Sequence, residues 1–417
     1  MSDSPAPTTE TPYDLVLKGG HVLDPANHLN SPLDVAIAGG KIAAVAPAIP
    51  AAQAKQTIDV SGLLVTPGIL DIHTHVYLFR TSAKSYVEGV HADAHLFSAG
   101  VTTTVDAGTA GWKHFLDFKE STIDRAKVRI LAFLNIACGG MTDDISEQTP
   151  GDMQPKIVAS LAQAFPQIIV GIKTAHYWTS LPWDDVHTPW ASVDRALEAA
   201  ALCGKPIMVD FWPRLPERPY PDLILKKLRP GDIHTHVFAQ QFPILTPDGK
   251  VQEHLFAARQ RGVRFDLGHG AGSFWFRNAV PALRGGFPPD TLSTDLHMGN
   301  INGPVASMLN TMSKYLSMGM SLEEVIERST TLPAQLIGRP DLGTLSVGSE
   351  ADVAVFEQRQ GQFGYADCGR AKIVGPHKLE CRLTLRAGQV VYDPAGFSMP
   401  LWEQAPAPYW YTPPGTY

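Results

Sequence analysis

The chain has 417 residues, 44% of them hydrophobic, so it can bury more than the core of one small domain. Its formal net charge of −7 argues against nucleic acid and against an anionic membrane surface as partners. No apolar run reaches the ~18 residues of a membrane span, and four cysteines without a CxxC pair are typical of reduced thiols in a cytoplasm. We therefore expect a cytoplasmic protein without a disulfide framework or a cysteine zinc site.

The two ends of the chain share one pattern. Residues 1–12 lack the basic-then-apolar profile of a secretory signal and are expected to form a short disordered lead. Residues 13–66 alternate short apolar runs with Gly-Gly and Ser-Gly turns, which predicts strands, and the pattern returns in residues 341–400. We therefore predict one small β-sandwich built from both chain ends. Residues 401–417 are rich in proline and aromatic side chains and are expected to dock on a surface.

Residues 67–340 alternate continuous apolar strands with helical segments, which is typical of a parallel sheet covered by helices. One such helix, WASVDRALEAAALCG, ends at Gly204. Eight units over roughly 270 residues predict a (β/α)8 barrel, so the predicted fold is α/β, a TIM-type barrel plus the β-sandwich. The candidate strands are GILDIHTHV, VTTTVDAG, RILAFLNIA, IIVGIKTAH, PIMVDFW, DIHTHVF, VRFDLGHG and TLSTDLH.

Polar residues gather where these strands end. In a barrel of this kind the C-terminal ends of the strands face the active site. Seven histidines lie at or just past strand ends, namely His73, His75, His176, His234, His236, His269 and His297.

His73 and His75 lie two residues apart on the first barrel strand, so both imidazoles point to the same side. Two neutral imidazoles placed in this way can bind one metal ion. The alternative is a pair of core histidines satisfied by hydrogen bonds. Asp295 ends the last strand and can be a third ligand or a general base, although an aspartate there can also cap a helix.

Lys173 lies on an apolar strand, where a buried cation is costly. Burial lowers the pKa of a lysine, and the neutral amine can react with carbon dioxide to give a carbamate. The carbamate is an anionic ligand with two oxygens that can bridge two metal ions. Alternatively, Lys173 is paired with Asp295 or Asp106.

Taken in this order, these motifs resemble one family. HTH after PGILDI, a lysine on strand four, His236 on strand six and Asp295 on strand eight resemble the amidohydrolase superfamily, as does GSEADVAVFE near the end. GDIHTHVF, FDLGHGAGSF and STDLHMGN are most similar to its dihydroorotase-like amidohydrolase/deacetylase branch. The resemblance spans almost the whole chain. It implies a binuclear site for zinc or manganese, with His73, His75 and Asp295 at the first ion, His236 at the second and carboxylated Lys173 bridging them. It also implies hydrolysis of an amide, ester or cyclic amide.

The sequence departs from this family on strand five. The family has a metal-ligating histidine there, whereas PIMVDFW has Asp210. A carboxylate can also bind zinc or manganese, so Asp210 can replace that histidine at the second metal. Alternatively, only one metal remains, or Asp210 is a structural hydrogen-bond acceptor. His234, two residues before His236 on the same face, could orient Asp210 from deeper in the barrel.

The remaining strand-end residues are assigned to the reaction and to the substrate. We predict that Asp295 takes a proton from the attacking water and passes it to the leaving group. His269, His297 and Asn300 are candidates to orient the substrate or to stabilise charge on its oxygen. Rim aromatics favour a substrate with an apolar or aromatic group, and arginines nearby could bind a carboxylate unless they are solvated surface residues. The candidate substrate contacts are Tyr177, Trp178, Phe211, Trp212, Phe274, Arg277 and Asn300, with Arg80 and Arg214 as further arginines.

The hypothesis from sequence is therefore a metal-dependent, deacetylase-like hydrolase. Its expected partners are a small-molecule substrate, an N-acyl amino acid or acylated hydroxy acid, and further copies of the chain in a homo-oligomer. One alternative is hydrolysis of a cyclic amide such as a hydantoin or dihydroorotate. Another is a metal-poor scaffold without catalysis, which Asp210 leaves open.

Overall fold

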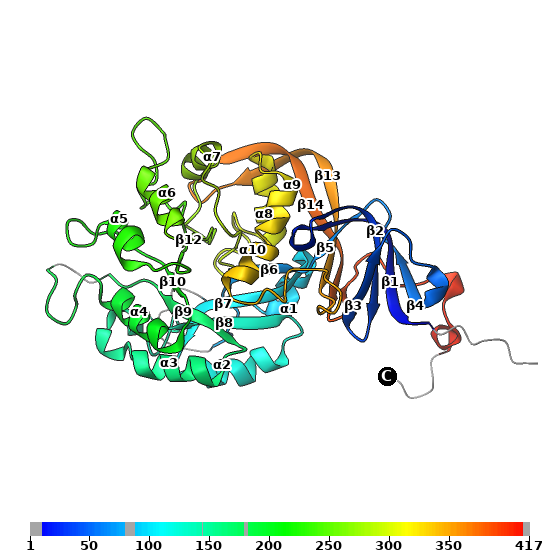
Figure 1. The fold of residues 1–417 in the computed structure, drawn as a ribbon, viewed down its shortest axis with the longest axis horizontal. Helices are drawn as coiled ribbons and strands as arrows, with labels where there is room; N and C mark the ends of the chain where they lie inside the picture. The colour runs from blue at the N-terminus through cyan, green and yellow to red at the C-terminus, as the bar shows by residue number, and fades with distance from the viewer. Residues whose placement is uncertain (1–10, 80–87, 144, 179–181, 412–417) are drawn as a thin grey trace, which may run out of the picture.

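The computed structural model of the chain describes residues 11–79, 88–143, 145–178 and 182–411. The described strands form two separate sheets (Figure 1). The strands are β1 (Tyr13–Asp24), β2 (Leu29–Ala38), β3 (Lys41–Ala46), β4 (Ala54–Asp59), β5 (Leu64–Pro67), β6 (Ile69–Thr74), β7 (Val101–Gly111), β8 (Arg129–Asn135), β9 (Ile169–Thr174), β10 (Ile207–Val209), β11 (Ile233–His234), β12 (Arg264–Phe265), β13 (Val353–Ala366), β14 (Lys372–Arg386) and β15 (Gln389–Tyr392). The helices are α1 (Ala92–His95), α2 (Phe115–Ser121), α3 (Pro155–Ala164), α4 (Ala191–Cys203), α5 (Tyr220–Asp222), α6 (Glu253–Gln260), α7 (Phe276–Arg284), α8 (Met308–Ser317), α9 (Leu322–Glu327) and α10 (Thr331–Leu336).

The middle of the chain forms a curled parallel sheet. Its strand order is β12-β11-β10-β9-β8-β7-β6, and every neighbouring pair is parallel. Parallel neighbours need a crossover connection, which helices such as α2, α3 and α4 provide on the outer face (Figure 1). Strands covered in this way are buried on both faces, as all eleven residues of β7 are. The sheet therefore brings the ends of strands that are far apart in sequence to one edge.

The two edges of this sheet meet through residues 291–296. Isolated parallel bridges join Thr74 to Leu296 and Asp266 to Thr291, and the His75 N–H donates to the Leu296 carbonyl at 2.9 Å. These residues form no regular strand, because Asp295 has a positive φ of 53° that interrupts extended backbone. The regular eight-stranded barrel is therefore not confirmed; the structure has seven parallel strands and an irregular segment between their edges.

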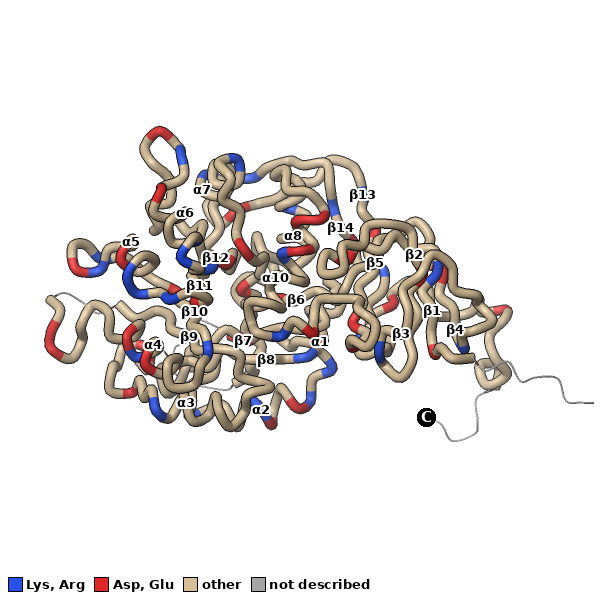
Figure 2. The backbone as a smooth tube through the Cα atoms, in the orientation of Figure 1, with Lys and Arg blue, Asp and Glu red and all other residues tan. Residues whose placement is uncertain are grey.

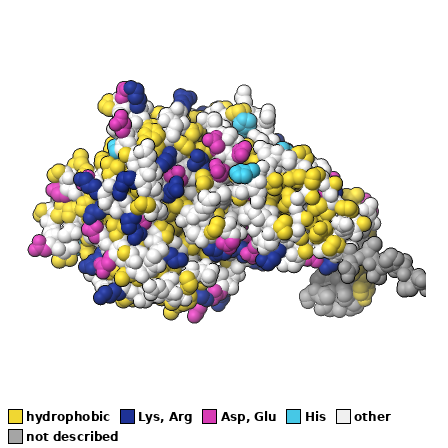
Figure 3. All heavy atoms as spheres, in the orientation of Figure 1, with side chains coloured by type: hydrophobic (Ala, Val, Ile, Leu, Met, Phe, Trp, Pro, Cys, Tyr) yellow, Lys and Arg dark blue, Asp and Glu magenta, His cyan; other side chains and the backbone are white. Residues whose placement is uncertain are grey.

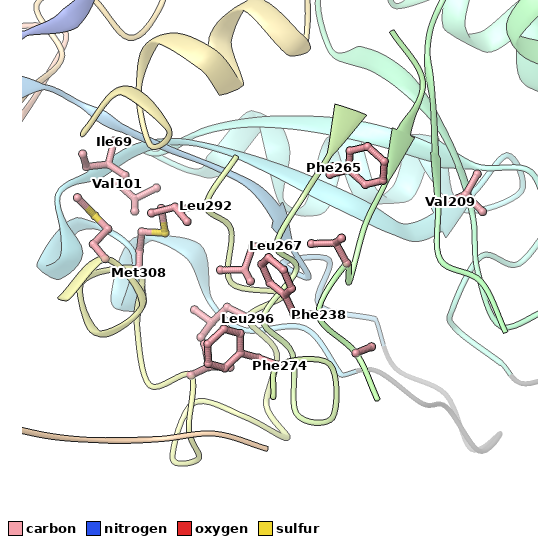
Figure 4. Packing of buried hydrophobic residues seen from close by; sticks show 14 of the residues in the cluster. Ile69, Val101, Val209, Phe238, Phe265, Leu267, Phe274, Leu292, Leu296 and Met308 are labelled. Atoms are coloured by element: carbon pink, nitrogen blue, oxygen red, sulfur yellow. The ribbon is translucent and has the colours of Figure 1, made fainter. Parts of the chain in front are cut away.

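The side chains of residues 291–296 divide between the core and the site. Leu292 and Leu296 lie in the apolar core beside Leu267 and Phe274 (Figure 4). The side chains between them are polar, and Asp295 lies 3.0 Å from the His75 ring. One side of the segment thus packs the core while the other serves the site.

Both chain ends together build the second sheet. Its order is β15-β14-β13-β5-β1-β2-β3, with β4 paired to β1, so strands from both chain ends lie in it. The strands lie in a single eight-stranded sheet, and the two packed sheets of a sandwich are not confirmed. The long β13 and β14 extend beside α8 toward α7 (Figure 1). Because β5 ends at Pro67 and β6 begins at Ile69, this sheet leads directly into the first strand of the site.

The surface carries charged residues of both signs (Figure 3), and the aromatic residues of the tail are largely exposed. Acidic and basic residues are interspersed along the loops and helices (Figures 2 and 3), and no helix in the described ranges is long and apolar enough to cross a membrane. In the tail, the ring centroids of Trp402 and Trp410 are 5.8 Å apart, and the two residues are 60% and 57% exposed. These aromatics therefore pack on each other rather than on the rest of the protein. Residues 1–10 of the expected lead, and Arg80, lie outside the described residues.

Candidate metal centre

Three of the predicted ligands converge at the strand ends. His73 is on β6, His75 follows it, and Asp295 comes from the segment that joins the sheet edges. Asp295 Oδ1 lies 3.0 Å from His75 Nε2 and 3.6 Å from His73 Nε2. Among the described His, Cys, Asp and Glu side chains, these three form the group whose ligand atoms all lie within 4.8 Å of one another. The spacing suits ligands of a single ion.

The hydrogen bonds behind the two imidazoles fix their tautomers. Thr235 Oγ1 donates to Asp266 at 2.7 Å, so it accepts the Nδ1 proton of His73 at 2.9 Å. In the same way Thr109 Oγ1 donates to Asp106 at 2.9 Å and accepts from His75 Nδ1 at 2.7 Å. Hydroxyl positions follow from this network rather than from observed protons.

With Nδ1 as the donor, the neutral form of each ring presents its Nε2 lone pair to the Asp295 carboxylate. Burial, together with the nearby Lys173, lowers the pKa of His73 to about 3, so this ring is neutral. Burial raises the pKa of Asp295, but His73 and His75 outweigh burial and hold it well below its ordinary value. Two lone pairs and an anionic oxygen face one another without a balancing positive charge. A divalent ion fits this donor set.

Asp266 is expected to control the affinity of this position. It is fully buried and also accepts from Thr291 and Ser293. Asp266→Asn should weaken zinc binding by about 10- to 100-fold, the usual effect of losing a group that orients a ligating histidine. Calorimetric titration of the apoprotein with zinc measures this. Asp232→Asn, at the opposite end of β11, is the buried control, and equal affinity in both variants would contradict the role of Asp266.

The backbone at the site is held in strained conformations. Asp295, His236 and His176 all have positive φ values, between 51° and 61°. Such conformations cost of order 1–3 kcal/mol each and persist when surrounding contacts hold them. For Asp295 these contacts include its N–H to the His73 carbonyl at 2.6 Å and its carbonyl to Asn300 Nδ2 at 2.5 Å. The strain turns the three side chains to one side at the strand ends.

Lys173 lies next to the first group. Its Nζ is 3.2 Å from His73 Nε2 and 3.7 Å from Met208 Sδ, and the side chain is fully buried. Neither Asp295 nor Asp106 is its hydrogen-bond partner, so the alternative of a simple ion pair is not supported. Burial lowers the pKa of Lys173 below its ordinary value, although Asp210 opposes this effect. A neutral amine beside a metal-facing nitrogen is suited to carboxylation.

A second group lies beside the first. His236 Nε2 and His176 Nε2 are 3.8 and 3.6 Å from Asp210 Oδ2, and the His236 and His73 rings are 5.0 Å apart. His236 Nδ1 donates to the Gly268 carbonyl at 2.6 Å, so its Nε2 carries the lone pair. Burial raises the pKa of Asp210, but His236 and His176 outweigh it and hold the pKa below its ordinary value. Asp210 therefore faces two imidazoles.

Two residues of this second group have no role in the sequence analysis. His176 ends strand four three residues after Lys173, and this position was the only signal for it. Glu147 lies in the short 3-10 helix Ser146–Gln148, in an irregular stretch without a motif, and its Oε2 is 2.8 Å from His176 Nδ1. Burial lowers the pKa of His176, yet Glu147 and Asp210 raise it to about 9.

His234 does not support the role expected for it. Strand β11 ends at His234, and the positive φ of His236 breaks the alternation on which the expectation depended. The His234 ring packs against Tyr220 and Phe242 with centroids at 5.2 and 4.7 Å. Neither ring nitrogen has a hydrogen-bond partner among the described residues, and burial lowers its pKa to about 3. It is a core side chain.

The three residues predicted to orient the substrate, His269, His297 and Asn300, have different surroundings in the structure. His269 is fully buried, 2.5 Å from Lys314 Nζ and stacked on Phe274, so it is engaged away from the ligand atoms. Asn300 accepts from the His297 N–H and donates to the Asp295 carbonyl, so it braces the loop. The side chains of His269 and Asn300 are both engaged by other protein groups, which does not favour binding of substrate by either.

His297 remains as the candidate oxygen donor. Its Nδ1 accepts from the Gly299 N–H at 3.1 Å, which places the proton of the neutral ring on Nε2. Burial lowers its pKa, and its ring lies 6.2 Å from that of His75.

The residues predicted to contact the substrate differ in how far they are exposed to solvent. Tyr177 and Phe274 are buried, and the exposed Arg277 lies over the Trp275 ring at 4.4 Å. Trp178 and Trp212 have ring centroids 5.8 Å apart, and Trp212 is 43% exposed. Trp178 is half-buried and its ring centroid lies 5.7 Å from that of His176, so these two indoles are the candidate aromatic contacts beside the second group.

An arginine that the sequence analysis did not select holds this pair of loops. Arg218 is buried and donates to the Tyr177 carbonyl at 2.6 Å and the Trp212 carbonyl at 2.9 Å. It also lies over the Phe211 ring at 4.9 Å, whereas Arg214 lies over Trp183. Arg218 thus ties the loop after β9 to the loop after β10.

The chain is similar to an amidohydrolase family model and to proteins named deacetylases. The model of a family described as the amidohydrolase family matches residues 291–392, the stretch that contains Asp295. A deacetylase of Enterococcus faecalis is 30% identical over 390 residues, covering 91% of this chain and 99% of the relative. A deacetylase of Agrobacterium fabrum is 34% identical over 337 residues, covering 78% of this chain and 79% of the relative.

Solved structures show the same architecture. A crystal structure of an adenine deaminase superposes with a TM-score of 0.81 at 29% identity, covering 91% of this chain and all of that one. A dihydroorotase superposes with a TM-score of 0.76 at 28% identity, covering 91% and 99%. An L-hydantoinase from Arthrobacter aurescens, at 18% identity and a TM-score of 0.66, shares the fold.

Proposed function

The chain belongs to the amidohydrolase superfamily, and from this premise we propose that it is a metal-dependent hydrolase that removes the acyl group from an N-acyl amino acid or an acylated hydroxy acid. The observation that carries the proposal is the convergence of His73, His75 and Asp295 with both imidazole lone pairs facing the carboxylate. A divalent ion bound there supplies Lewis acidity toward a carbonyl oxygen and lowers the pKa of water.

The residues of the chain have separate tasks in this reaction. His73, His75 and Asp295 would hold the ion, with zinc or manganese as candidates, and a carboxylated Lys173 would add an oxygen ligand. Asp295 accepts a proton from the attacking water, whose oxygen bonds to the acyl carbon. The same proton then passes to the leaving nitrogen or oxygen as its bond to carbon breaks. His297 can donate its Nε2 proton in a hydrogen bond to the acyl oxygen, where negative charge develops.

The proposed substrate class depends on two observations. Trp178 and Trp212 lie beside the second group and can pack against an apolar or aromatic side chain of the substrate. The relatives from Enterococcus faecalis and Agrobacterium fabrum, which match most of the chain, are named deacetylases. Both favour a linear acyl substrate with an apolar group.

A second candidate is hydrolysis of a cyclic amide. It is favoured by the similarity to the dihydroorotase structure and by a 91-residue stretch that is 41% identical to a dihydroorotase of Streptococcus pyogenes. That stretch is 22% of the chain, whereas the match to the Enterococcus faecalis deacetylase covers 91% of the chain. A metal-poor scaffold is disfavoured because His73, His75 and Asp295 converge in a group that could hold a metal ion.

One substrate comparison tests the proposal. Zinc-loaded and manganese-loaded protein is supplied with N-acetyl amino acids, acetylated hydroxy acids, dihydroorotate, a hydantoin and adenine. We expect release of acetate from the acetylated compounds, fastest when the side chain is aromatic. Turnover confined to the cyclic compounds or to adenine would overturn the proposed substrate class. Metal-loaded protein that cleaves none of the compounds would count against hydrolysis of these bonds altogether.

A further inference from the structure

We propose that His176 is a metal ligand that completes, with Asp210 and His236, the second of the two metal positions that membership of the amidohydrolase superfamily implies. Glu147 orients His176 in this arrangement. The inference rests on the proposed function, because it extends the same metal centre. It assigns a role to two residues, His176 and Glu147, that the sequence motifs leave out.

Asp210 lies near both imidazoles, although the ligand atoms of the three described residues are not all within 4.8 Å of one another. Asp210 follows β10, and its Oδ2 lies 3.6 Å from His176 Nε2 after β9 and 3.8 Å from His236 Nε2 after β11. Ligands of a tetrahedral ion with bonds of about 2.0–2.1 Å are roughly 3.3 Å apart. Each separation from Asp210 is therefore a few tenths of an ångström above that of bound ligands. The carboxylate lies between two imidazoles from the strands on either side of its own.

The backs of both imidazoles are held by acceptors. Glu147 Oε2 is 2.8 Å from His176 Nδ1, and the Gly268 carbonyl is 2.6 Å from His236 Nδ1. Glu147 is itself buried and accepts from Asn135 Nδ2 at 3.0 Å. A carboxylate or carbonyl behind a histidine is the usual support of a metal ligand, because it keeps the proton on the rear nitrogen. The front nitrogens then face Asp210.

Space and conformation also favour this position. Both His176 and His236 have positive φ, a strain that surrounding contacts must hold. A side chain at Gly268, where φ is +46°, would approach within 2.7 Å of His236 Nδ1, so this glycine allows the His236 ring its place. Lys173 precedes His176 by three residues, and its amine lies beside His73 of the first group. A carboxylated Lys173 would therefore lie where it could bridge both positions.

The competing explanation is a protonated His176 that forms ion pairs with Glu147 and Asp210 and binds no metal. The two explanations differ in metal content rather than in activity alone. The apoprotein is loaded with manganese in the presence of bicarbonate and dialysed, and metal per chain is measured for wild type and His176→Ala. His187→Ala is the matched control, because His187 is a half-exposed histidine that pairs with Asp184, which belongs to neither group of ligands.

We expect the wild type and His187→Ala to hold a bridged pair of ions and His176→Ala to hold one. Electron paramagnetic resonance gives an independent readout, since the spin-coupled signal of a manganese pair should be replaced by the hyperfine pattern of an isolated ion. Equal stoichiometry in wild type and His176→Ala would overturn the assignment. A wild type that binds one ion and still cleaves acetylated substrates would overturn this inference while the proposed function stands.

Glu147→Gln keeps the assignment testable if His176→Ala does not fold. Glutamine preserves the size of the side chain but weakens its acceptance of the Nδ1 proton. The affinity for the second ion is expected to fall by about 10- to 100-fold, with the first ion unaffected. Unchanged affinity for both ions in a folded Glu147→Gln protein would overturn the proposal. Two bound ions without cleavage of any tested substrate would instead contradict the proposed function.

Discussion

Replacing Asp295 with asparagine is expected to lower kcat by about 10²–10⁴-fold, the usual contribution of a general acid or base. The asparagine amide cannot accept the proton of the attacking water, although its oxygen can still face His73 and His75. The fold should persist, because the backbone of residue 295 keeps its hydrogen bonds to the His73 carbonyl and to Asn300. The measurement is kcat on an acetylated substrate at equal metal occupancy.

The control for this prediction is Asp290→Asn, which changes a carboxylate just before the same segment. Asp290 accepts from the Phe265 N–H at 2.8 Å and lies at the other end of the sheet from the ligands. This variant should lose stability rather than turnover. If Asp295→Asn retained near wild-type kcat with full metal content, another residue would have to be the base.

Replacing Lys173 with methionine is expected to lower kcat/KM by more than the about 10–100-fold typical of groups that merely orient a ligand. Methionine fills a similar volume in the buried strand but has no amine to form a carbamate. Wild type equilibrated with ¹³C-labelled bicarbonate should show a carbamate carbon signal that Lys173→Met lacks.

Lys173→Arg separates carboxylation from charge. Arginine keeps a cation beside His73, but its guanidinium stays protonated and forms no carbamate. It should therefore be as impaired as methionine. A wild-type protein without the labelled signal under metal and bicarbonate, or a fully active Lys173→Arg, would contradict carboxylation.

Local periodicity was sufficient for part of the site. His73 and His75 share a face because residues two apart on a strand must do so, and both lie near Asp295. The apolar run around Lys173 correctly implied a buried amine, because strands of a covered parallel sheet have no solvent-facing side. The repeated strand pattern at both chain ends indicated that both contribute to one β unit, which the structure forms as a single sheet and not as the predicted sandwich.

Tertiary structure decided the rest, because those contacts depend on where the chain leaves regular geometry. Positive φ at His236 ends the alternation, so His234 enters the aromatic core while His236 faces Asp210. Glu147 reaches His176 from an irregular stretch between β8 and α3, and no spacing in the sequence relates the two. A period of two applies only while φ and ψ stay extended, and the strand ends that build this site are where they do not.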